Sequence, residues 1–366
     1  MRIIRLGQGS SFPSDFSPKH AGMRDQACIN GSSILTLGNF DGVHRGHQSL
    51  LYQLLQQAQK LRLTQKNIYA GIILFEPHAR EYFAREQGTE LPPRLLSLKD
   101  KISVLHSAYM RRIMPCPLDF IALYACNKEN IRRTAAQFVQ HCLYRQLQMR
   151  YIITGKDFRF GAERQGSIET LRDYSKTYPF AISQIPDCTE TFAAEENGQH
   201  LPKQRISSTN IRTLLRQGAI ASANKLLGYA YFIQGRVIKG RQFGRTINTP
   251  TANIHYKQGT LALAGVYITW LYYKGKHYPA VTHIGYNQTL QPLPDRPQVE
   301  THLLQQNIHL YGAQVHIIFL RKLRNEQKFP NLEALKNAIE ADKKAAESYF
   351  SCHQVEAAQQ KSIIAD

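Results

Sequence analysis

Residues 35–51 read LTLGNFDGVHRGHQSLL and combine a short apolar run, a turn and two histidines. Gly38 ends the apolar run, residues 41–42 (Asp-Gly) supply a turn, and His44 and His47 stand three residues apart where an amphipathic helix begins. The N-terminus of a helix carries unpaired N–H groups and positive partial charge, so it attracts phosphate. The stretch therefore predicts a strand–turn–helix unit that binds a phosphorylated ligand. A bare H-x-x-H spacing, taken alone, is more often a pair of histidines that merely cap a helix.

The pattern around this stretch alternates strands and helices as far as about residue 185. Strands are expected at 34–38, 68–77, 151–155 and 180–185, and helices near 47–63, 97–107, 134–147 and 167–178. The near-continuous apolar strand at 68–77 suits a sheet that is buried on both faces. We therefore expect a parallel α/β sheet whose ligands bind beyond the carboxyl ends of the strands.

The second half of the chain has a different pattern. Two helices are expected at 208–216 and 220–227, the latter ending at Gly228, a left-handed stop. Antiparallel strands without intervening helices follow at 232–240, 265–273, 276–286, 298–304 and 315–323, which favours a β-barrel. A terminal helix at 331–350 places Leu332, Leu335 and Ile339 on one face.

The fold class is thus α/β, with a Rossmann-like parallel sheet followed by an antiparallel barrel and a terminal helix. The expected domains are residues 1–228 and 229–350, with a polar tail at 351–366.

Composition and charge argue against several classes of protein. The 366 residues carry a formal net charge of +19 and six scattered cysteines without a C-x-x-C pair, so neither a disulfide framework nor a zinc site is expected. No apolar run reaches the roughly 20 residues that cross a bilayer, and the N-terminus lacks the apolar core of a secretory signal. We expect a cytoplasmic protein without a membrane or nucleic-acid partner, whose basic charge is compatible with nucleotide substrates. Its state, monomer or homo-oligomer, is left open.

Four longer strings in the first domain point to one family. GNFDGVHRGHQ (38–48) resembles the H-x-G-H signature of nucleotidyltransferases in the version that bacterial FAD synthetases carry, and ISSTNIR (206–212) resembles their partner motif. TGKDFRFG (154–161) resembles the family's G-x-DFRFG loop, although Lys156 stands at a position that is often acidic or polar in relatives. FEPHAREYF (75–83) resembles the EPHPREFF segment, with Ala79 in place of a proline.

The resemblance implies two groups of binding residues in this domain. ATP would be bound by Gly38, Asn39, Phe40, Asp41, His44, His47, Ser207, Ser208, Thr209 and Arg212. The flavin would be bound by Pro77, His78, Asp157, Phe158 and Phe160. Taken alone, the SST run reads as a plain helix cap, the two phenylalanines are as often core residues, and His78 also suits a simple exit from a strand into a loop.

The barrel carries its own phosphate-binding motifs. GRVIKGRQFGRTINTPTANI (235–254) contains PTAN, which alone is best read as a β-turn but resembles the riboflavin kinase motif. Asn248-Thr249 replaces a frequent Gly-Phe pair before it. VETHLL (299–304) resembles the strand that carries the family's catalytic glutamate, and FLRKLRNEQKF (319–329) resembles a further family string. Without the resemblance, Glu300 would be a surface glutamate and Arg324 part of a solvated turn.

The resemblance to bifunctional riboflavin kinase/FAD synthetases implies two reactions. Riboflavin and ATP would give FMN and ADP in the barrel, with Glu300 as general base, and FMN and ATP would give FAD and pyrophosphate in the α/β domain, supported by His44, His47 and Arg212. ATP and flavin in the barrel would be bound by Gly240, Gly244, Arg245, Pro250, Thr251, Asn253 and Arg324. Mg²⁺ bound with ATP would be held by Thr251 and Asn253. An enzyme with one active site, or a basic nucleic-acid-binding protein on the same fold, are the alternatives.

Overall fold

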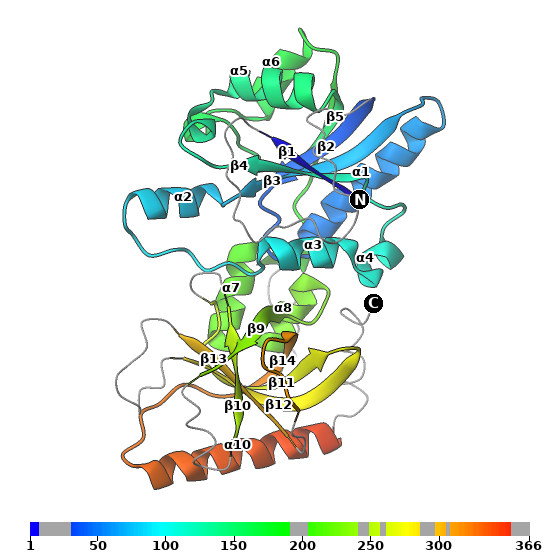
Figure 1. The fold of residues 1–366 in the computed structure, drawn as a ribbon. Helices are drawn as coiled ribbons and strands as arrows, with labels where there is room; N and C mark the ends of the chain where they lie inside the picture. Colours follow the sequence, from blue (N-terminus) through cyan, green and yellow to red (C-terminus); the bar gives the residue numbers. More distant parts are fainter. Residues whose placement is uncertain are drawn as a thin grey trace. The chain divides into compact units, whose positions relative to one another are not determined.

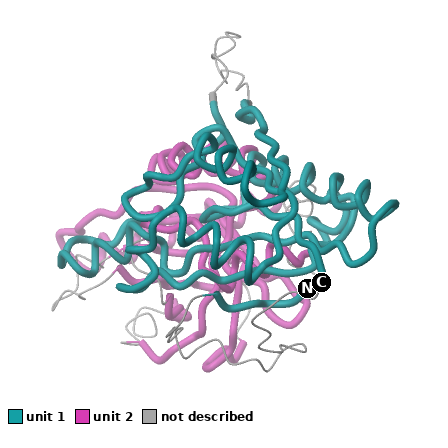
Figure 2. Tube along the Cα trace, turned by 90° about the horizontal axis from the view of Figure 1, so that it is seen from above, with its two compact units in different colours: residues 1–92, 108–206 teal, residues 93–107, 207–366 magenta. Residues whose placement is uncertain are grey.

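The computed structural model describes residues 1–6, 31–190, 204–240, 249–256, 261–285, 297–304 and 308–352. The chain divides into two compact units: residues 1–92 with 108–206 form unit 1, and residues 93–107 with 207–366 form unit 2 (Figure 2). Residues 93–107 and 207–228, which the sequence analysis places in the N-terminal domain, thus group with the barrel in space. The functional boundary at residue 228 stays a prediction, because proximity does not say which reaction a segment serves.

Unit 1 is built on a parallel sheet of six strands in the order β1-β4-β3-β2-β5-β6 (Figure 1). Its strands are β1 (Arg2–Leu6), β2 (Ser32–Gly38), β3 (Ile68–Glu76), β4 (Phe120–Ala125), β5 (Met149–Gly155) and β6 (Ala181–Ile185). The parallel α/β prediction is therefore confirmed. The sequence analysis misses β1 and β4, which pair with each other although more than a hundred residues separate them.

The two faces of the sheet are covered by different helices. The helical elements of unit 1 are α1 (Arg45–Arg62), α2 (Ala79–Glu86), α4 (Ala108–Ile113), η1 (Asn130–Arg132), α5 (Ala135–Gln137), η2 (Phe138–Gln146), η3 (Ala162–Arg164) and α6 (Ile168–Ser175). Leu35 and Leu37 of β2 belong to one core cluster with Phe138 and Leu171 of η2 and α6. Because side chains alternate along a strand, Ile34 points to the opposite face, where α1 lies beside β2 and β3.

Helix α1 forms because its apolar residues recur with helical spacing. Leu50, Leu51, Leu54 and Leu55 are all buried, and each contributes about 2 kcal/mol of hydrophobic stabilisation. The helix begins at Arg45, two residues before the predicted start at His47. The predicted single helix at 134–147 is instead α5 followed by the π-helix η2, in which the N–H of Leu147 donates to the carbonyl of Cys142.

Two further segments of unit 1 differ from the prediction. The segment after β3, for which a loop exit was one of two alternatives, passes a cis peptide bond between Glu76 and Pro77 and forms α2. The two-stranded hairpin β7 (Thr189–Glu190) and β8 (Gln204–Arg205) leads directly to the ISSTNIR motif. Neither short element has an apolar period in the sequence.

Unit 2 contains a closed barrel in the order β10-β13-β12-β11-β14-β9, which confirms the predicted antiparallel barrel. Its strands are β9 (Phe232–Ile238), β10 (Thr251–His255), β11 (Gly265–Tyr273), β12 (Lys276–Gly285), β13 (Gln298–Leu303) and β14 (Gln314–Arg324). Its helices are α3 (Leu98–His106), α7 (Ser208–Gln217), α8 (Ile220–Leu227) and α10 (Leu332–Cys352). The left-handed stop at Gly228 is confirmed by its φ of 80°.

The barrel interior holds a row of bonded hydroxyl groups. Thr269 and Thr282 are joined at 2.8 Å and Thr282 and Thr301 at 3.0 Å, and all three side chains are buried. Since neighbours along a strand alternate, Glu300 and His283, adjacent to these threonines, point to the outer face of the barrel. This alternation decides which residues of β13 can meet a ligand outside the barrel.

The reading of PTAN as a turn is wrong. Thr251, Ala252 and Asn253 lie inside β10, which pairs with β9 on one side and β13 on the other. Proline begins the segment just outside the strand, where its missing N–H costs no ladder bond. The tetrapeptide looks like a turn locally, and only its two distant partners make it a strand.

Helix α10 confirms the predicted terminal helix and extends it to Cys352. Its buried stripe runs through Asp342 and Ala346, with Leu335 and Ile339 half-buried, whereas Leu332 is 45% exposed. The tail beyond Cys352 lies outside the described residues. Among the helices that the structure describes, none is long and apolar enough to cross a membrane.

Candidate functional site

The strand order of the parallel sheet indicates a ligand-binding position at the carboxyl ends of the neighbouring strands β2 and β5. Strands β2, β3 and β4 follow one another in one direction, whereas β5 and β6 continue on the other side of β2. Ligands of such sheets bind at the carboxyl ends of the strands where the order reverses. The loop after β2 carries Gly38 to His47, and the loop after β5 carries Asp157 to Phe160, so both predicted motifs leave the sheet at this point.

The loop after β2 has an unusual backbone. Phe40, Gly42 and Val43 have φ values of 47°, 84° and 39°, in the left-handed region. Phe40 and Val43 are fully buried, so packing maintains a conformation that costs such residues about 1–3 kcal/mol each. Asp41 is also buried, whereas Asn39 is exposed. The strain is concentrated where the chain enters α1.

The two histidines of the motif stack at the N-terminus of α1. His44 caps the helix, because its Nδ1 accepts the backbone N–H of His47 at 3.3 Å. The rings lie parallel, with centroids 3.7 Å apart, and Phe40 packs on His47 at 4.8 Å. Since Nδ1 of His44 is an acceptor, the proton of its neutral ring is on Nε2. The first turn of α1 contains no acidic residue, so the pair stands in the positive field of the helix end.

Gly46 lies close to both the His44 ring and a second segment of the chain. A Cβ at Gly46 would stand 3.2 Å from Cε1 and Nδ1 of His44 and 3.5 Å from the carbonyl oxygen of Ile206. Ile206 is the first residue of the ISSTNIR motif and the last of unit 1. The chain therefore enters its second motif beside the helix that carries the histidines.

A hydrogen-bonded pair supports the loop from behind. The amide nitrogen of Gln48 donates to the carbonyl of Val43 at 2.8 Å, and its amide oxygen accepts the hydroxyl proton of Tyr109 at 2.9 Å. Burial raises the pKa of Tyr109, so its hydroxyl remains a donor. Tyr109 is 61 residues from Gln48, and no local pattern marked it.

The two phenylalanines of the DFRFG loop lie mostly in the core. Phe160 is 4% exposed and belongs to the core cluster, and Phe158 is half-buried against it, with the rings stacked 5.3 Å apart. Asp157 is exposed and forms an ion pair with Arg205, which also pairs with Asp187 at 3.2 Å. Arg205 thereby lowers the pKa of Asp157. The structure favours a packing role for Phe160 over direct ligand contact.

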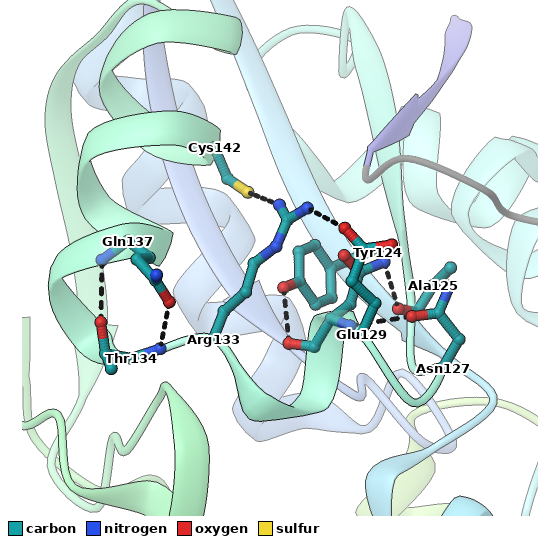
Figure 3. A network of polar contacts seen from close by, with 9 residues as sticks. Tyr124, Ala125, Asn127, Glu129, Arg133, Thr134, Gln137 and Cys142 are labelled. Carbon is teal, nitrogen blue, oxygen red and sulfur yellow. Dashed lines mark hydrogen bonds and ion pairs between the residues drawn. The ribbon is translucent and has the colours of Figure 1, made fainter.

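A partly exposed polar network around Arg133 borders this loop (Figure 3). Arg133 donates to Glu129 at 3.3 Å and to the sulfur of Cys142 at 3.7 Å, and its carbonyl accepts the N–H of Ala162 at 2.8 Å. Gly161 has a φ of 74°, and a Cβ there would lie 2.8 Å from the backbone nitrogen of Ala135. Only glycine lets the loop approach the start of α5 so closely.

The remaining flavin candidates stand at the end of β3. His78 precedes α2 and is 6% exposed, with Nδ1 3.9 Å from Oε1 of Glu81. Pro77 forms the cis peptide bond with Glu76. Burial beside a carboxylate fits a structural histidine as well as a ligand-binding one, so both flavin assignments stay predictions.

The ISSTNIR motif begins α7 in unit 2. Ser207 is the cap, since its hydroxyl accepts the N–H of Asn210 at 3.2 Å, and Ser208 and Thr209 are the first helical residues. The guanidinium of Arg212 donates through Nε to the carbonyl of Pro93 at 2.8 Å. The first turn of α7 has no acidic residue, which again suits an anion.

The barrel motifs meet in one row on neighbouring strands. Asn253 of β10 is paired with Glu300 of β13, and Glu300 with His283 of β12, so the three side chains share the outer face. The next row pairs Thr251 with His302. A Cβ at Gly240 would lie 2.2 Å from Nδ2 of Asn253, so only a residue without a side chain fits beside this amide. The predicted residues Gly244 and Arg245 lie outside the described residues.

Two histidines flank Glu300 on this face, and the sequence analysis missed both. Nδ1 of His302 lies 2.9 Å from the carbonyl oxygen of Pro250, and Nε2 of His283 lies 3.6 Å from Oε1 of Glu326. Burial lowers the pKa of each histidine below its ordinary value. His302 follows Glu300 by two residues, so strand alternation alone would have placed it beside the glutamate.

Arg324 has a partner that the sequence does not indicate. Its guanidinium binds the carboxylate of Asp342 in α10, with Nε 3.1 Å from both oxygens and Nη2 2.8 Å from Oδ2. It also lies over the ring of Phe329 at 5.4 Å. These contacts support a structural role in which Arg324 anchors α10 to the barrel.

The oxygen donors of the barrel row fit a hard cation bound with a nucleotide. The hydroxyl of Thr251, the amide oxygen of Asn253 and the carboxylate of Glu300 are ligands of the type that Mg²⁺ takes alongside substrate phosphates. Within the described part of the chain no cluster of three His, Cys, Asp or Glu side chains could hold a metal by itself. The cleft along α1, lined by Tyr52, Lys60 and Tyr151 among others, contains none of the predicted site residues.

Comparisons with known proteins follow the two-part organisation. A family model of FAD synthetase matches residues 27–195, and one of riboflavin kinase matches residues 227–350. The bifunctional riboflavin kinase/FMN adenylyltransferase of Escherichia coli (strain K12) is 35% identical over 318 residues, which cover 87% of this chain and 92% of that protein. The protein of the same description from Haemophilus influenzae is 36% identical over 319 residues, covering 87% and 94%.

A solved structure shares the fold. The crystal structure of a protein described as a macrolide-efflux protein from Streptococcus pneumoniae matches with a TM-score of 0.66 and covers 87% of this chain and 94% of that chain. Its sequence identity of 23% limits the likeness to the fold.

Proposed function

The chain belongs to the family of bifunctional riboflavin kinase/FMN adenylyltransferases, and on this premise we propose which residues carry each of its two reactions. The enzyme phosphorylates riboflavin to FMN in its C-terminal part and adenylylates FMN to FAD in its N-terminal part. ATP serves both steps, and ADP and pyrophosphate leave. The observation that carries the residue assignment is the cross-strand pairing of Asn253 with Glu300.

In the kinase step Glu300 is the general base. Its carboxylate takes the proton of the 5′-hydroxyl of riboflavin as that oxygen bonds to the γ-phosphorus and the bond to ADP breaks. The position on the outer face supports this role, because a carboxylate inside the barrel would lie among buried side chains such as Tyr267 and Ile284. Gly240, Pro250 and the loop with Gly244 and Arg245 are assigned to nucleotide or flavin binding on the family motif.

Thr251 and Asn253 are the proposed holders of Mg²⁺ bound with ATP. When bound, the ion neutralises charge on the phosphates as the γ-phosphoryl group transfers. Asn253 lies directly opposite Glu300, the proposed base, on the neighbouring strand. Gly240 has no side chain that would collide with the amide of Asn253. The strand β10 thus presents its oxygens on the face that carries Glu300.

In the adenylyl step the phosphate of FMN attacks the α-phosphorus of ATP, and pyrophosphate leaves. The parallel imidazoles of His44 and His47 donate hydrogen bonds to the polyphosphate and offset the charge that builds during transfer. No protein nucleophile is required. Ser207, Ser208, Thr209 and Arg212 are assigned to the same step on the family motif and on their place at the start of α7.

The same proposal assigns the loop after β2 to ATP and the ends of β3 and β5 to the flavin. The ATP residues are Gly38, Asn39, Phe40 and Asp41. The flavin residues are Pro77, His78, Asp157 and Phe158, with the buried Phe160 packed against Phe158. Of the flavin residues, Asp157 and the half-buried Phe158 have the exposure that ligand contact needs. A cytoplasmic location and the absence of a nucleic-acid partner stay predictions.

A chromatographic time course with riboflavin, ATP and Mg²⁺ tests the assignment. His47→Ala and Arg212→Ala should each abolish FAD formation while FMN accumulates, and Glu300→Gln should abolish FMN formation while supplied FMN still becomes FAD. Each activity is the internal control for the other, because both reside in one chain. Loss of both activities in a single variant would contradict the assignment to separate sites, and unchanged kinase turnover in Glu300→Gln would remove it as the base.

A further inference from the structure

The carbonyl of Pro250 is held by a histidine of the neighbouring strand. Pro250 stands just before β10, and its oxygen lies 2.9 Å from Nδ1 of His302. A carbonyl oxygen only accepts hydrogen bonds, so Nδ1 of His302 carries the proton. The ring is therefore fixed in the Nδ1–H tautomer, and its Nε2 is the acceptor in the neutral form.

This bond acts where β10 is least supported. Strand β10 is five residues long, and its pairing with β9 begins only at Asn253. Among the described residues, the start of the strand at Thr251 is paired only with β13, directly opposite His302. A strand end that is paired on only one side opens locally at a low free-energy cost. A side-chain hydrogen bond at such an end therefore decides how firmly it stays paired.

The residues at this end are those assigned to the nucleotide and its Mg²⁺. Thr251 faces His302, and two residues further along Asn253 faces Glu300, so both pairs lie on one face of the barrel. Holding Pro250 against His302 keeps the Thr251 and Asn253 oxygens at a set distance from the carboxylate of Glu300. A shift of this strand end would move the oxygens but leave the base in place.

We propose that His302 is a positioning residue of the riboflavin kinase site, which sets the PTAN oxygens against Glu300 through its Nδ1–H bond to the Pro250 carbonyl. The inference rests on the proposed assignment of PTAN and Glu300 to that site. His302 itself needs no contact with riboflavin or ATP. The charges of Lys343 and Glu340 in α10 also act on the pKa of His302, and the residue is partly buried, so a purely packing role is the competing explanation.

Three variants separate these roles. Asparagine carries an amide nitrogen near the position of Nδ1, glutamine carries it near Nε2, and phenylalanine keeps the ring without a donor. His302→Phe and His302→Gln should raise the KM for Mg²⁺–ATP in FMN formation by about tenfold or more, as loss of an outer partner of a metal site does. His302→Asn should stay within about threefold of the wild type.

The KM for riboflavin and the rate of FAD formation from supplied FMN should be unchanged in all three. Hydrogen exchange of the peptide that covers residues 249–256 supplies a readout independent of turnover. Exchange there should be faster in His302→Phe and His302→Gln than in His302→Asn, in the full-length protein.

The outcomes distinguish this inference from the assignment beneath it. If His302→Phe matches the wild type in KM for Mg²⁺–ATP and in exchange, the histidine merely packs and the inference is overturned. If all three variants lose kcat and gain KM to the same extent, the ring has a general structural role, which also overturns the inference. Glu300→Gln, measured in parallel, decides the other question: retained kinase activity there would refute the proposed site itself.

Discussion

Gly46 is the glycine between the two histidines of the H-x-G-H motif, and Gly46→Ala should lower FAD formation without destabilising the protein. Gly46 is the second residue of α1, where alanine is the better helix former by up to about 1 kcal/mol. The added Cβ would lie 3.2 Å from Cε1 and Nδ1 of His44, closer than ordinary contact. Helix stability and activity should therefore change in opposite directions.

The size of the effect follows from how the ring is held. His44 is 6% exposed, stacked on His47 at 3.7 Å and bonded to its N–H, so it yields only by moving both rings. Relief of the contact needs a shift on the order of 0.3–0.5 Å. Since a misplacement of about 1 Å costs about a hundredfold in rate, this shift should cost about four- to tenfold in kcat/KM. Tenfold corresponds to about 1.4 kcal/mol of activation free energy.

The assay is the initial rate of FAD formation from FMN and ATP, with FMN formation from riboflavin measured on the same preparation. Kinase turnover should be unchanged, and the unfolding midpoint should be equal or higher. If kcat/KM for FAD formation stays within about twofold of the wild type, His44 is not held as tightly as the stacking indicates. If both activities fall together, the substitution disturbs the fold and not the histidine pair.

Three further perturbations test other contacts. Tyr109→Phe removes the bond to Gln48 behind the histidine loop and should slow FAD formation about threefold to tenfold, with kinase turnover unchanged. Asp342→Ala leaves the guanidinium of Arg324 without its carboxylate and should destabilise the barrel by about 3 kcal/mol, measured by denaturation through the fluorescence of the single tryptophan. Burial raises the pKa of Asp100 from 3.8 to about 6, so the folded state keeps a proton that the unfolded chain releases. The contribution of this group to the free energy of unfolding is complete below about pH 4 and is lost as the pH rises through 6. Asp100→Asn should therefore abolish this pH dependence, which amounts to about 3 kcal/mol, when the same denaturation is repeated across this pH range.

The fluorescence readout is specific because of where the tryptophan lies. Trp270 is in β11 of the barrel, and its ring centroid is 4.5 Å from that of Phe350 in α10. It therefore reports on the barrel and on the helix that Arg324 anchors. If the unfolding midpoint of Asp342→Ala equals that of the wild type, the attraction between Arg324 and Asp342 only offsets the cost of removing both charges from water.

Much of the fold followed from local patterns. The helical spacing of leucines predicted α1, and the apolar run at 68–77 predicted β3, because each pattern reflects the period of a single element. Strands β1 and β4 were missed, since β1 is a strand only through its pairing with β4. PTAN taken alone suggested a turn for the same reason: β10 exists through β9 and β13, and nothing within the tetrapeptide indicates either partner.

For the candidate site, the motif strings predicted His44, His47, Asn253 and Glu300, and the register brings the latter two together on one face. The strings did not reveal which atoms support them. Tyr109 reaches the histidine loop from 61 residues away and has no neighbouring signal.

The sequence by itself determined the two-part organisation, the periods of its main helices and strands, and the chemical types gathered in each motif. These depend on short-range spacing, which a linear chain displays directly. The tertiary structure alone decided that Asn253 stands opposite Glu300, that His302 holds Pro250, and that Arg324 binds Asp342. Strand register and ion-pair choice are set by packing between distant segments, where many local sequences are compatible and only one arrangement buries the core.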